Sequence, residues 1–571
     1  MQKTTKANAI CFKAVAILIA LFIASCAGGH LGKNNSGQFK NGMVVSANEI
    51  ASQVGVDILK KGGNAVDAAV AVQFALAVVY PNAGNIGGGG FLVYRSAKGD
   101  VNTLDFREKA PGVATRDMYL DSVGKPIVEK SLYGQLAAGV PGSVAGMVEA
   151  HQKYGKLKWA VLLAPSIELA NNGFKISARQ ANELNGLRNR FTKLNPLGTA
   201  LVKDTKWAEG DLLTQAELGA TMKLIADKGR AGFYEGTVAD AIVAEMARGG
   251  GIISKADLKN YQAVWRKPLQ GKYRGFEVIT MPPPSSGGIA LIQLLKSVEP
   301  YPLKRWGFNT DSTVQLMIEA ERRVYADRAK HLGDPDFYKV PTQGLMADDY
   351  VKNRMSSFSW NKASTSASID AGEVAPTEHE ETTHFSIVDR EGNAVAITTT
   401  LNGSYGAAVV VKNAGFLLNN EMDDFSVKPG APNMYGLVGG EANAIAPNKR
   451  MLSSMTPAIL AKDGKLYMVV GTPGGSTIIT SVFQTILNVV DFDMSMQNAV
   501  TAKKFHHQWL PDEVAVESKA LDSLTIEKLK AKGYKFVNRG AIGRVDAILK
   551  TKWGYYQGGA DPRGDDKAVG W

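Results

Sequence analysis

The chain has 571 residues, and its 65 lysines and arginines against 54 aspartates and glutamates give a formal net charge of +11 at pH 7. The lysines are scattered and form no basic helix. This argues against nucleic-acid binding, although the charge could draw anionic small molecules or a membrane surface. Cys11 and Cys26 are the only cysteines. A thiol mechanism, a structural disulfide and a cysteine-ligated metal site are therefore excluded for the mature chain.

The first 26 residues have the pattern of an export signal. Three lysines accompany a short apolar run at 14–24, which is too short to span a bilayer. The segment ends in Ile-Ala-Ser-Cys, which resembles a bacterial lipoprotein box with Cys26 as the acylated residue. An ordinary signal cut near Ala27 is the alternative, and the sequence leaves both open. We therefore expect an exported protein, periplasmic or secreted, whose only membrane attachment would be through Cys26.

The mature chain contains no long Pro-rich, Gly/Ser-rich or single-charge stretch that would divide it into domains. It begins with two predicted helices. The first, at 49–61, has apolar residues at helical spacing, and the second, at 65–79, is apolar almost all round, which predicts burial. The glycine run at 84–90 lies between a helix and a strand. This order is the reverse of a dinucleotide-binding fingerprint, so no nucleotide site is predicted there.

Strands predicted at 91–95 and 101–106 lead to Arg107. An arginine at a strand end can hold a carboxylate with its planar fork of donors or form a surface ion pair, and this fragment leaves both open. Residues 134–250 are predicted to be mainly helical and carry no catalytic signal. A further helix is predicted at 313–329, and we expect its acidic and basic side chains to form exposed pairs.

A β-hairpin is predicted at 380–402, where two runs of β-formers flank a polar turn that contains glycine. A turn centred near Glu391 pairs residues whose numbers sum to about 782, which places Thr382 opposite Thr400. A threonine hydroxyl becomes a useful nucleophile only beside a base. The α-amine that a cut before Thr382 would release could be that base. Paired threonines in strands are also common structural features, so the hairpin alone does not show whether Thr382 is catalytic or structural.

A strand predicted at 415–420 leads to the acidic stretch 421–425. Acids at this place can bind an ammonium group or a metal, or simply cap a turn. Because no pair of histidines at ligand spacing lies nearby, we do not predict a metal. The glycine- and proline-rich segment 429–440, around Tyr435, resembles a mobile lid.

A strand predicted at 466–470 runs into the glycine turn 471–476 and then a helix at 477–490. Backbone N–H groups at such a turn can bind an anion or form an oxyanion hole. The turn lacks the Gly-Lys-Ser/Thr ending of a nucleotide-binding loop, so we predict no nucleoside triphosphate and no other cofactor. His506 and His507 are expected to pack and to form hydrogen bonds, not to act in a Ser-His-Asp triad.

In this order and spacing, the motifs resemble those of the bacterial γ-glutamyltransferases (γ-glutamyltranspeptidases), which are N-terminal nucleophile hydrolases. The resemblance extends over nearly the whole mature chain. It implies an α+β fold, a four-layer αββα sandwich built from both autoprocessed subunits. The motifs that carry it are Gly-Gly-Asn-Ala-Val-Asp-Ala at 62–68, the glycine run to Phe91 at 87–91, Asp-Phe-Arg-Glu at 105–108, Thr-Thr-His-Phe-Ser at 382–386, Leu-Asn-Asn to Phe425 at 418–425, Pro-Gly-Gly at 473–475, Phe-His-His-Gln-Trp-Leu-Pro-Asp at 505–512 and Asp-Pro-Arg at 561–563.

The resemblance also implies that the precursor cleaves itself between Glu381 and Thr382. The products would be a large subunit, 27–381, and a small catalytic subunit, 382–571, joined as a heterodimer. Thr382 would be the nucleophile and Thr400 its hydrogen-bond partner, in agreement with the hairpin register.

The other implied site residues surround the substrate. Glu421 departs from the pattern of many relatives, which have glutamine there, but an extra negative charge still suits an ammonium group. The lid with Tyr435 matches a segment that some relatives have and others lack. By the resemblance, the oxyanion hole is formed by Gly474 and Gly475, the α-carboxylate is held by Arg107, Asn402, Ser453 and Ser454, and the α-ammonium is received by Glu421 and Asp424.

The expected reaction is formation of a γ-glutamyl ester on Thr382 from glutathione or another γ-glutamyl amide. Water or an amino-acid or peptide acceptor then releases the ester. Two alternatives stay open. A glutaryl or cephalosporin acylase of the same superfamily would have no use for an ammonium site, and a non-catalytic exported amino-acid-binding protein would not cut itself.

Overall fold

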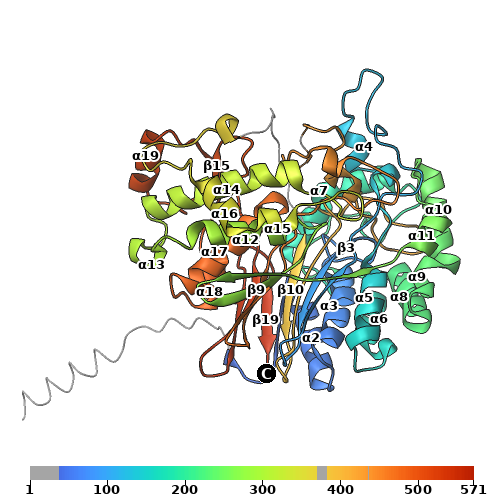
Figure 1. Cartoon of the computed structure of the whole chain (residues 1–571). Coiled ribbons are helices and arrows are strands. Elements are labelled where there is room, and N and C mark those ends of the chain that lie inside the picture. Colours follow the sequence, from blue (N-terminus) through green and yellow to red (C-terminus); the bar gives the residue numbers. More distant parts are fainter. Residues whose placement is uncertain (1–37, 370–381, 432, 435) are drawn as a thin grey trace, which may run out of the picture. The chain divides into compact units, whose positions relative to one another are not determined.

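Two seven-stranded sheets form the centre of the computed structural model (Figure 1). The structure describes residues 38–369, 382–431, 433–434 and 436–571. The predicted export signal with Cys26, and also Glu381 and Tyr435, lie outside the described residues. Residues 38–571 form one unit. Within the described residues no helix is both long enough and apolar enough to span a membrane.

All neighbouring strands in both central sheets are antiparallel. Two small sheets accompany them: β5 (Phe174–Lys175) with β6 (Leu212–Leu213), and β14 (Phe505–His506) with β15 (Val514–Glu517) and β16 (Phe536–Arg539). In spatial order, sheet A is β1 (Gln38–Phe39), β18 (Tyr556–Ala560), β17 (Asp546–Lys550), β13 (Lys465–Gly471), β12 (Ala458–Lys462), β9 (Phe276–Thr280) and β8 (Leu269–Tyr273). Sheet B is β19 (Lys567–Gly570), β2 (Met43–Ser46), β10 (Thr383–Val388), β11 (Ala394–Thr400), β3 (Gly89–Arg95), β4 (Val101–Asp105) and β7 (Val264–Arg266).

Helices cover the outer face of each sheet (Figure 1). Sheet B is covered by helices from the first half of the chain: α2 (Glu49–Lys60), α3 (Ala65–Val79), α5 (Ser143–Tyr154) and α6 (Trp159–Asn172), with α7 (Ala178–Leu194), α8 (Ala216–Lys228), α9 (Ala231–Tyr234), α10 (Gly236–Gly249) and α11 (Lys255–Asn260) beyond them. Sheet A is covered by α12 (Gly287–Val298), α14 (Asp311–His331), α17 (Ile478–Val490) and α18 (Met496–Thr501). Shorter helices are α4 (Val128–Leu132), α13 (Leu303–Trp306), α15 (Thr342–Leu345), α16 (Asp348–Met355) and α19 (Ser523–Ala531).

Three apolar layers hold the sandwich together, one under each helical layer and one between the sheets. Successive side chains of a strand point to opposite faces, so a central strand must be apolar on both. In β10, Phe385 and Ile387 pack toward the helices while Val388 packs between the sheets. The predicted four-layer αββα fold is confirmed.

Several predicted elements are confirmed with nearly the predicted bounds. Helix α2 begins after Asn48, whose side chain accepts a hydrogen bond from the Ile50 N–H at 2.9 Å. Helix α3 begins with a capping box between Asn64 and Asp67. In the hairpin, Thr383 pairs with Thr399 and each following pair keeps the predicted register.

The expectation of exposed charge pairs on the helix at 313–329 is wrong. Helix α14 is longer than predicted, and the charged side chains between residues 319 and 328 are buried because other segments cover the side that faces away from sheet A. Arg323 bonds Ser357 and Ser364, and the Glu321 carboxylate accepts from the His507 N–H at 2.9 Å. The buried charged residues include Glu319, Glu321, Arg322, Arg323, Asp327 and Arg328, each at most 6% exposed.

The prediction of a strand at 415–420 is also wrong, because the structure has only an isolated bridge between Val410 and Leu417 there. Gly415 has φ +73°, a left-handed conformation that interrupts an extended run. The segment is instead held by Asn419, whose side-chain amide donates to the Gly87 and Gly139 carbonyls, both at 2.8 Å.

Candidate active site

Thr382 lies directly before β10, in the middle of sheet B. Its Oγ is 3.5 Å from Oγ of Thr400, the last residue of β11. The Asn402 N–H donates to the Thr400 hydroxyl oxygen at 2.7 Å, which orients the second hydroxyl. Both threonines are buried, at 4% and 2% exposed. The predicted cross-strand contact is therefore present, and the hairpin register produces it.

A pocket opens beside these hydroxyls and collects residues that are far apart in the chain. Three apolar side chains, Leu437, Met455 and Ile478, form part of its wall. The structure thus brings together most of the sequence-predicted site residues, although their roles stay predictions. Those that line the pocket are Arg107, Thr382, Thr400, Asn402, Asp424, Ser453 and Ser454.

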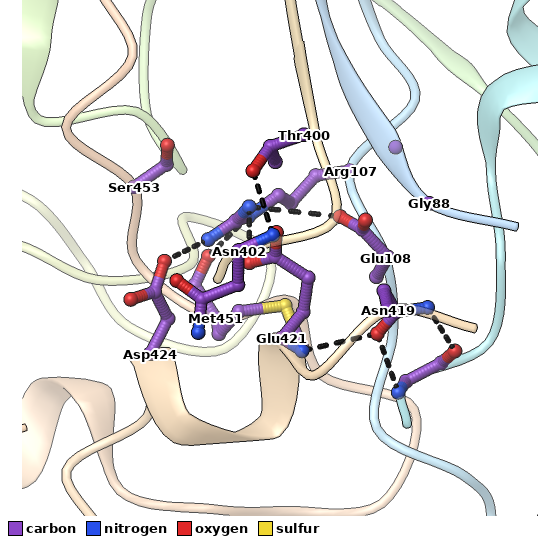
Figure 2. A network of polar contacts seen from close by, with 12 residues as sticks. Gly88, Arg107, Glu108, Thr400, Asn402, Asn419, Glu421, Asp424, Met451 and Ser453 are labelled. Carbon is purple, nitrogen blue, oxygen red and sulfur yellow. Dashed lines mark hydrogen bonds and ion pairs between the residues drawn. The ribbon is translucent and has the colours of Figure 1, made fainter. Parts of the chain in front are cut away.

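Arg107 is the charged centre of the pocket (Figure 2). Its Nη1 lies 2.6 Å from Glu421 Oε2 and 3.6 Å from Glu108 Oε2, and its Nη2 forms an ion pair with Asp424. Only 1% of Arg107 is exposed. Burial lowers the pKa of Arg107, but the carboxylates of Glu421, Asp424 and Glu108 outweigh burial and raise it, so the guanidinium stays charged.

The acids around Arg107 hold more negative charge than one guanidinium can balance. Burial raises the pKa of Glu108 to about 8, opposed by Arg107. Burial likewise raises the pKa of Glu421 well above its usual range and that of Asp424 to a smaller extent, again opposed by Arg107. Arg328 also favours ionisation of Asp424, but even with both arginines three buried carboxylates ionise together only at a large desolvation cost. The cluster therefore retains a proton near neutral pH.

Glu421 and Asp424 stand on the short 3₁₀ helix η3 (Glu421–Asp424). Asn419 fixes the start of η3, because its side-chain oxygen accepts hydrogen bonds from the Glu421 N–H at 3.1 Å and the Gly139 N–H at 2.9 Å (Figure 2). Asp424 lines the pocket, whereas Glu421 lies behind Arg107. No role was predicted for Asn419 from the sequence, although it comes two residues before Glu421.

Ser453 and Ser454 come from the segment that follows the acids and lies against residues 285–286. The Ser453 hydroxyl oxygen accepts from the Met455 N–H at 3.1 Å, and the Ser286 N–H donates to the Ser453 carbonyl at 2.8 Å. The Ser454 hydroxyl accepts from Arg328 Nη2 at 3.0 Å.

Arg328 is a site residue that sequence reasoning missed. It is buried on α14, and its Nε also donates to the Ser286 hydroxyl at 3.0 Å. Burial lowers the pKa of Arg328, while Tyr325 and Asp424 raise it. The sequence signal for Arg328 was its helical spacing from Tyr325. The two residues are three apart, which predicts that they share a face of α14.

The glycine turn lies between β13 and α17. Gly474 and Gly475 have φ +137° and +48°, conformations that favour glycine. The Thr477 N–H and hydroxyl both donate to the Gly474 carbonyl at 2.8 Å, and the Tyr325 hydroxyl donates to the Ser476 carbonyl. The two glycines do not line the pocket themselves, but Ile478, at the start of α17, does.

His384, His506 and His507 are buried and hydrogen-bonded, and none of them lines the pocket. His384 Nδ1 is 2.9 Å from Thr398 Oγ, and burial lowers the pKa of His384 to about 3, so its ring is neutral. His506 Nδ1 is 2.8 Å from Thr480 Oγ. In the part of the chain that the structure describes, no group of three or more histidine, cysteine or acidic side chains is arranged to hold a metal ion.

Comparison with known proteins decides the family. The sequence profile of the family described as gamma-glutamyltranspeptidase matches residues 51–571 of this chain. The chain belongs to the γ-glutamyltranspeptidase family.

Relatives agree with this assignment to the γ-glutamyltranspeptidases. The chain is 48% identical over 539 residues to the glutathione hydrolase proenzyme of Escherichia coli (strain K12), covering 93% of this chain and 92% of that protein. A solved chain of the Helicobacter pylori γ-glutamyltranspeptidase is 45% identical and covers 57% of this chain and 92% of its own length, with a TM-score of 0.54. The cephalosporin acylase from Bacillus halodurans is 27% identical and covers 94% of this chain and 96% of its own, with a TM-score of 0.83.

Proposed function

We propose that this chain is an autoprocessing γ-glutamyltransferase and glutathione hydrolase whose nucleophile is Thr382. The observation that carries the proposal is the position of Thr382 at the start of β10, 3.5 Å from Thr400, on the wall of a pocket with a buried arginine. Relatives that are named glutathione hydrolase proenzymes support the same reading.

In the proposed reaction, cleavage between Glu381 and Thr382 first frees the α-amine of Thr382. The Thr382 hydroxyl then attacks the γ-carbonyl carbon of the donor, and the α-amine accepts the hydroxyl proton. Collapse of the tetrahedral intermediate breaks the amide bond, and the leaving amine takes the proton. Water or an acceptor amine attacks the resulting ester and regenerates Thr382. The N–H groups of Gly474 and Gly475 would stabilise the oxyanion in both halves of the reaction.

The charges around Arg107 suit the two ends of a γ-glutamyl group. Without a ligand, the guanidinium is paired with Glu421 and Asp424. A γ-glutamyl donor brings one carboxylate, which can pair with Arg107, and one ammonium, which can pair with the acids. Every buried charge therefore keeps a partner when the donor binds. Its two fixed ends then orient the side-chain amide toward Thr382. Asn402, Ser453 and Ser454 would complete the grip on the carboxylate.

The proposal extends to processing and location. The precursor would yield a large subunit, 27–381, and a small subunit, 382–571, that remain a heterodimer. Residues 1–26 would direct export to the periplasm or beyond, with Cys26 as the candidate lipid anchor. Amino acids and dipeptides are the proposed acceptors.

The cephalosporin acylase reading is the second candidate, because the acylase structure covers nearly the whole chain. The acids beside Arg107 argue against it, since a glutaryl group lacks the α-ammonium that they would receive. Two chromogenic anilides that differ only in this group, γ-glutamyl-p-nitroanilide and glutaryl-p-nitroanilide, separate the two readings. We expect kcat/KM for the glutamyl compound to be at least ~100-fold higher, about 2.7 kcal/mol. Equal values would favour the acylase.

The nucleophile is tested by Thr382→Ala, which should abolish both chain cleavage and release of glutamate from glutathione. Thr382→Ser is the matched control, because it keeps a hydroxyl and an α-amine and should retain measurable activity. Turnover by Thr382→Ala would show that another residue attacks the donor.

A further inference from the structure

Turns from both sheets meet at one end of the sandwich. The β12–β13 and β17–β18 turns are neighbours because β13 pairs antiparallel with β17. The β3–β4 and β10–β11 turns are neighbours in the same way, since β11 pairs with β3. Arg95 Nη2 donates to the Gly464 carbonyl at 2.6 Å and joins the turns of the two sheets. We call this end the turn surface, comprising residues 38–42, 96–100, 389–393, 462–465 and 551–555.

The turn surface is basic. Six exposed basic side chains stand against three exposed acidic side chains and the carboxylate of Trp571, and Lys550 stands half-buried just inside the surface. Lysines and arginines close to an anionic bilayer are attracted to its negative surface. The exposed basic residues are Lys40, Lys98, Arg390, Lys462, Lys465 and Lys552, and the exposed acidic residues are Asp100, Glu391 and Asp463.

An exposed aromatic pair stands at the tip of the β17–β18 turn. Trp553 is 70% exposed, more than any other aromatic side chain among the described residues, and Tyr555 is 38% exposed. Lys552 Nζ lies 4.6 Å from the Trp553 ring. Tryptophan and tyrosine are enriched at the headgroup level of membranes, where one part of the ring is apolar and another is wet. At the turn tip, Trp553 presents most of its ring to solvent, and Lys552 is the charged side chain beside it.

The chain enters the described body at this same end. Strand β1 pairs with β18, with Phe39 opposite Tyr556, directly behind the Trp553 tip. The C-terminus, marked in Figure 1, is also here, since the Asn41 N–H donates to the Trp571 carbonyl at 2.9 Å. Any anchor on the chain before Gln38 is therefore joined to the body beside the turn surface.

The pocket lies at the opposite end of the strands. β10 runs from the residue after Thr382 to Val388 and then into the 389–393 turn. Six residues of strand at about 3.3 Å each separate the two ends by roughly 20 Å. A contact at the turn surface would leave the pocket facing away from whatever it touches.

We propose that the turn surface docks on an anionic lipid bilayer, with Trp553 among the headgroups and the lysines against lipid phosphates. This contact does not depend on lipidation of Cys26, although such an anchor would be joined to the body at the same end. Nor does it depend on the proposed catalytic function.

Co-sedimentation with vesicles tests the proposal on the chain as the cell produces it. One set of vesicles contains phosphatidylethanolamine and phosphatidylglycerol at 3:1, and the other contains phosphatidylcholine alone. We expect at least ~10-fold stronger partition onto the anionic vesicles at low salt, and most of this difference should vanish in 0.5 M NaCl. A lipid on Cys26 would strengthen binding to both kinds of vesicle equally. The difference in binding between them therefore measures the contribution of the turn surface.

The double variant Lys552→Ser with Trp553→Ser should lose most of the preference for anionic vesicles. Its matched control, Leu524→Ser with Lys530→Ser, removes an exposed apolar residue and an exposed lysine from α19. Both variants should process and turn over a soluble donor normally, which shows that they are folded. Equal binding by the two variants, or no preference for anionic lipid in the unmodified chain, would overturn the proposal.

Discussion

Arg107 and its three carboxylates set the chemistry of the pocket at the scale of single residues. Asp424→Ala removes the carboxylate that both lines the pocket and pairs with Arg107. A buried ammonium without its partner costs a few kcal/mol, so the KM for a γ-glutamyl donor should rise at least ~10-fold. Steady-state kinetics with γ-glutamyl-p-nitroanilide measures this effect. Asp117→Ala, at an exposed position, is the control, and an unchanged KM in Asp424→Ala would remove Asp424 from the site.

Glu108 predicts a pH dependence of stability. Its pKa is about 8 in the folded chain against 4.5 ordinarily, so between these values the folded state holds a proton that the unfolded state releases. The stability contribution of Glu108 is therefore full below pH 4.5 and is lost as the pH rises toward 8. Glu108→Gln should flatten this fall by up to about 1.4 kcal/mol per pH unit.

Urea unfolding at pH 5.5, 6.5 and 7.5 measures the slope, in a Thr382→Ala background so that one uncut chain unfolds. Glu391→Gln, in the exposed hairpin turn, is the control and should leave the slope unchanged. If Glu108→Gln also leaves it unchanged, the retained proton is not on Glu108.

Arg328 should act on the substrate through Ser454, which it holds by a 3.0 Å hydrogen bond. Arg328→Met removes that donor, and we expect the donor KM to rise about 5-fold or more, roughly 1 kcal/mol, with a smaller change in kcat. A double-mutant cycle with Ser454→Ala checks the mechanism. The two effects should be less than additive, whereas full additivity would mean that Arg328 does not position Ser454.

At the scale of elements, the contact between β10 and β13 joins the nucleophile strand to the glycine turn. A Cβ on Gly471, the last residue of β13, would lie 2.3 Å from the His384 ring. Gly471→Ala should therefore displace residues 472–475 relative to Thr382 and slow both processing and turnover by at least ~10-fold.

A second change tests this explanation. His384→Ala makes room for the new methyl group, so it should recover part of the activity that Gly471→Ala loses. Gly186→Ala, on α7 with nothing within 4 Å of the added atom, is the control and should process normally, with a stability gain of roughly 0.5–1 kcal/mol. A normal processing rate in Gly471→Ala, measured by denaturing electrophoresis, would contradict the coupling.

The elements that could be predicted from sequence are those fixed by local physics. The hairpin register followed from the turn chemistry of residues 390–393, and it placed Thr382 beside Thr400 before any tertiary contact was known. The helix at 65–79 followed from its apolar composition, and the structure shows that a capping box between Asn64 and Asp67 fixes its start.

The parts of the fold and of the site that were not predicted depend on tertiary contacts, which a sequence does not show. Helix α14 carries so many charges that a solvated face was the simpler interpretation, yet residues 356–369 and 505–512 cover it. The stretch 415–420 has the composition of a strand, but Gly415 and the Asn419 side chain turn it into an irregular loop. Arg328 joined the site only because the fold brings α14 against Ser454.

At the scale of the whole molecule, the proposed cut would leave each sheet built from both subunits. In sheet B, β10 and β11 of the small subunit lie between β2 and β3 of the large one. In sheet A, β12 pairs with β9 across the same division. The two subunits should therefore co-elute in gel filtration and separate only in denaturant. Dissociation of the cut protein in native buffer would contradict this interleaved arrangement.

The central claim is that a broken peptide bond supplies the base that activates Thr382. Intact mass and N-terminal sequencing of the active protein, purified without added protease, test it most directly. The account predicts a 382–571 fragment with threonine at its N-terminus, in the same amount as the large subunit. An active preparation that consists of one uncut chain would contradict it.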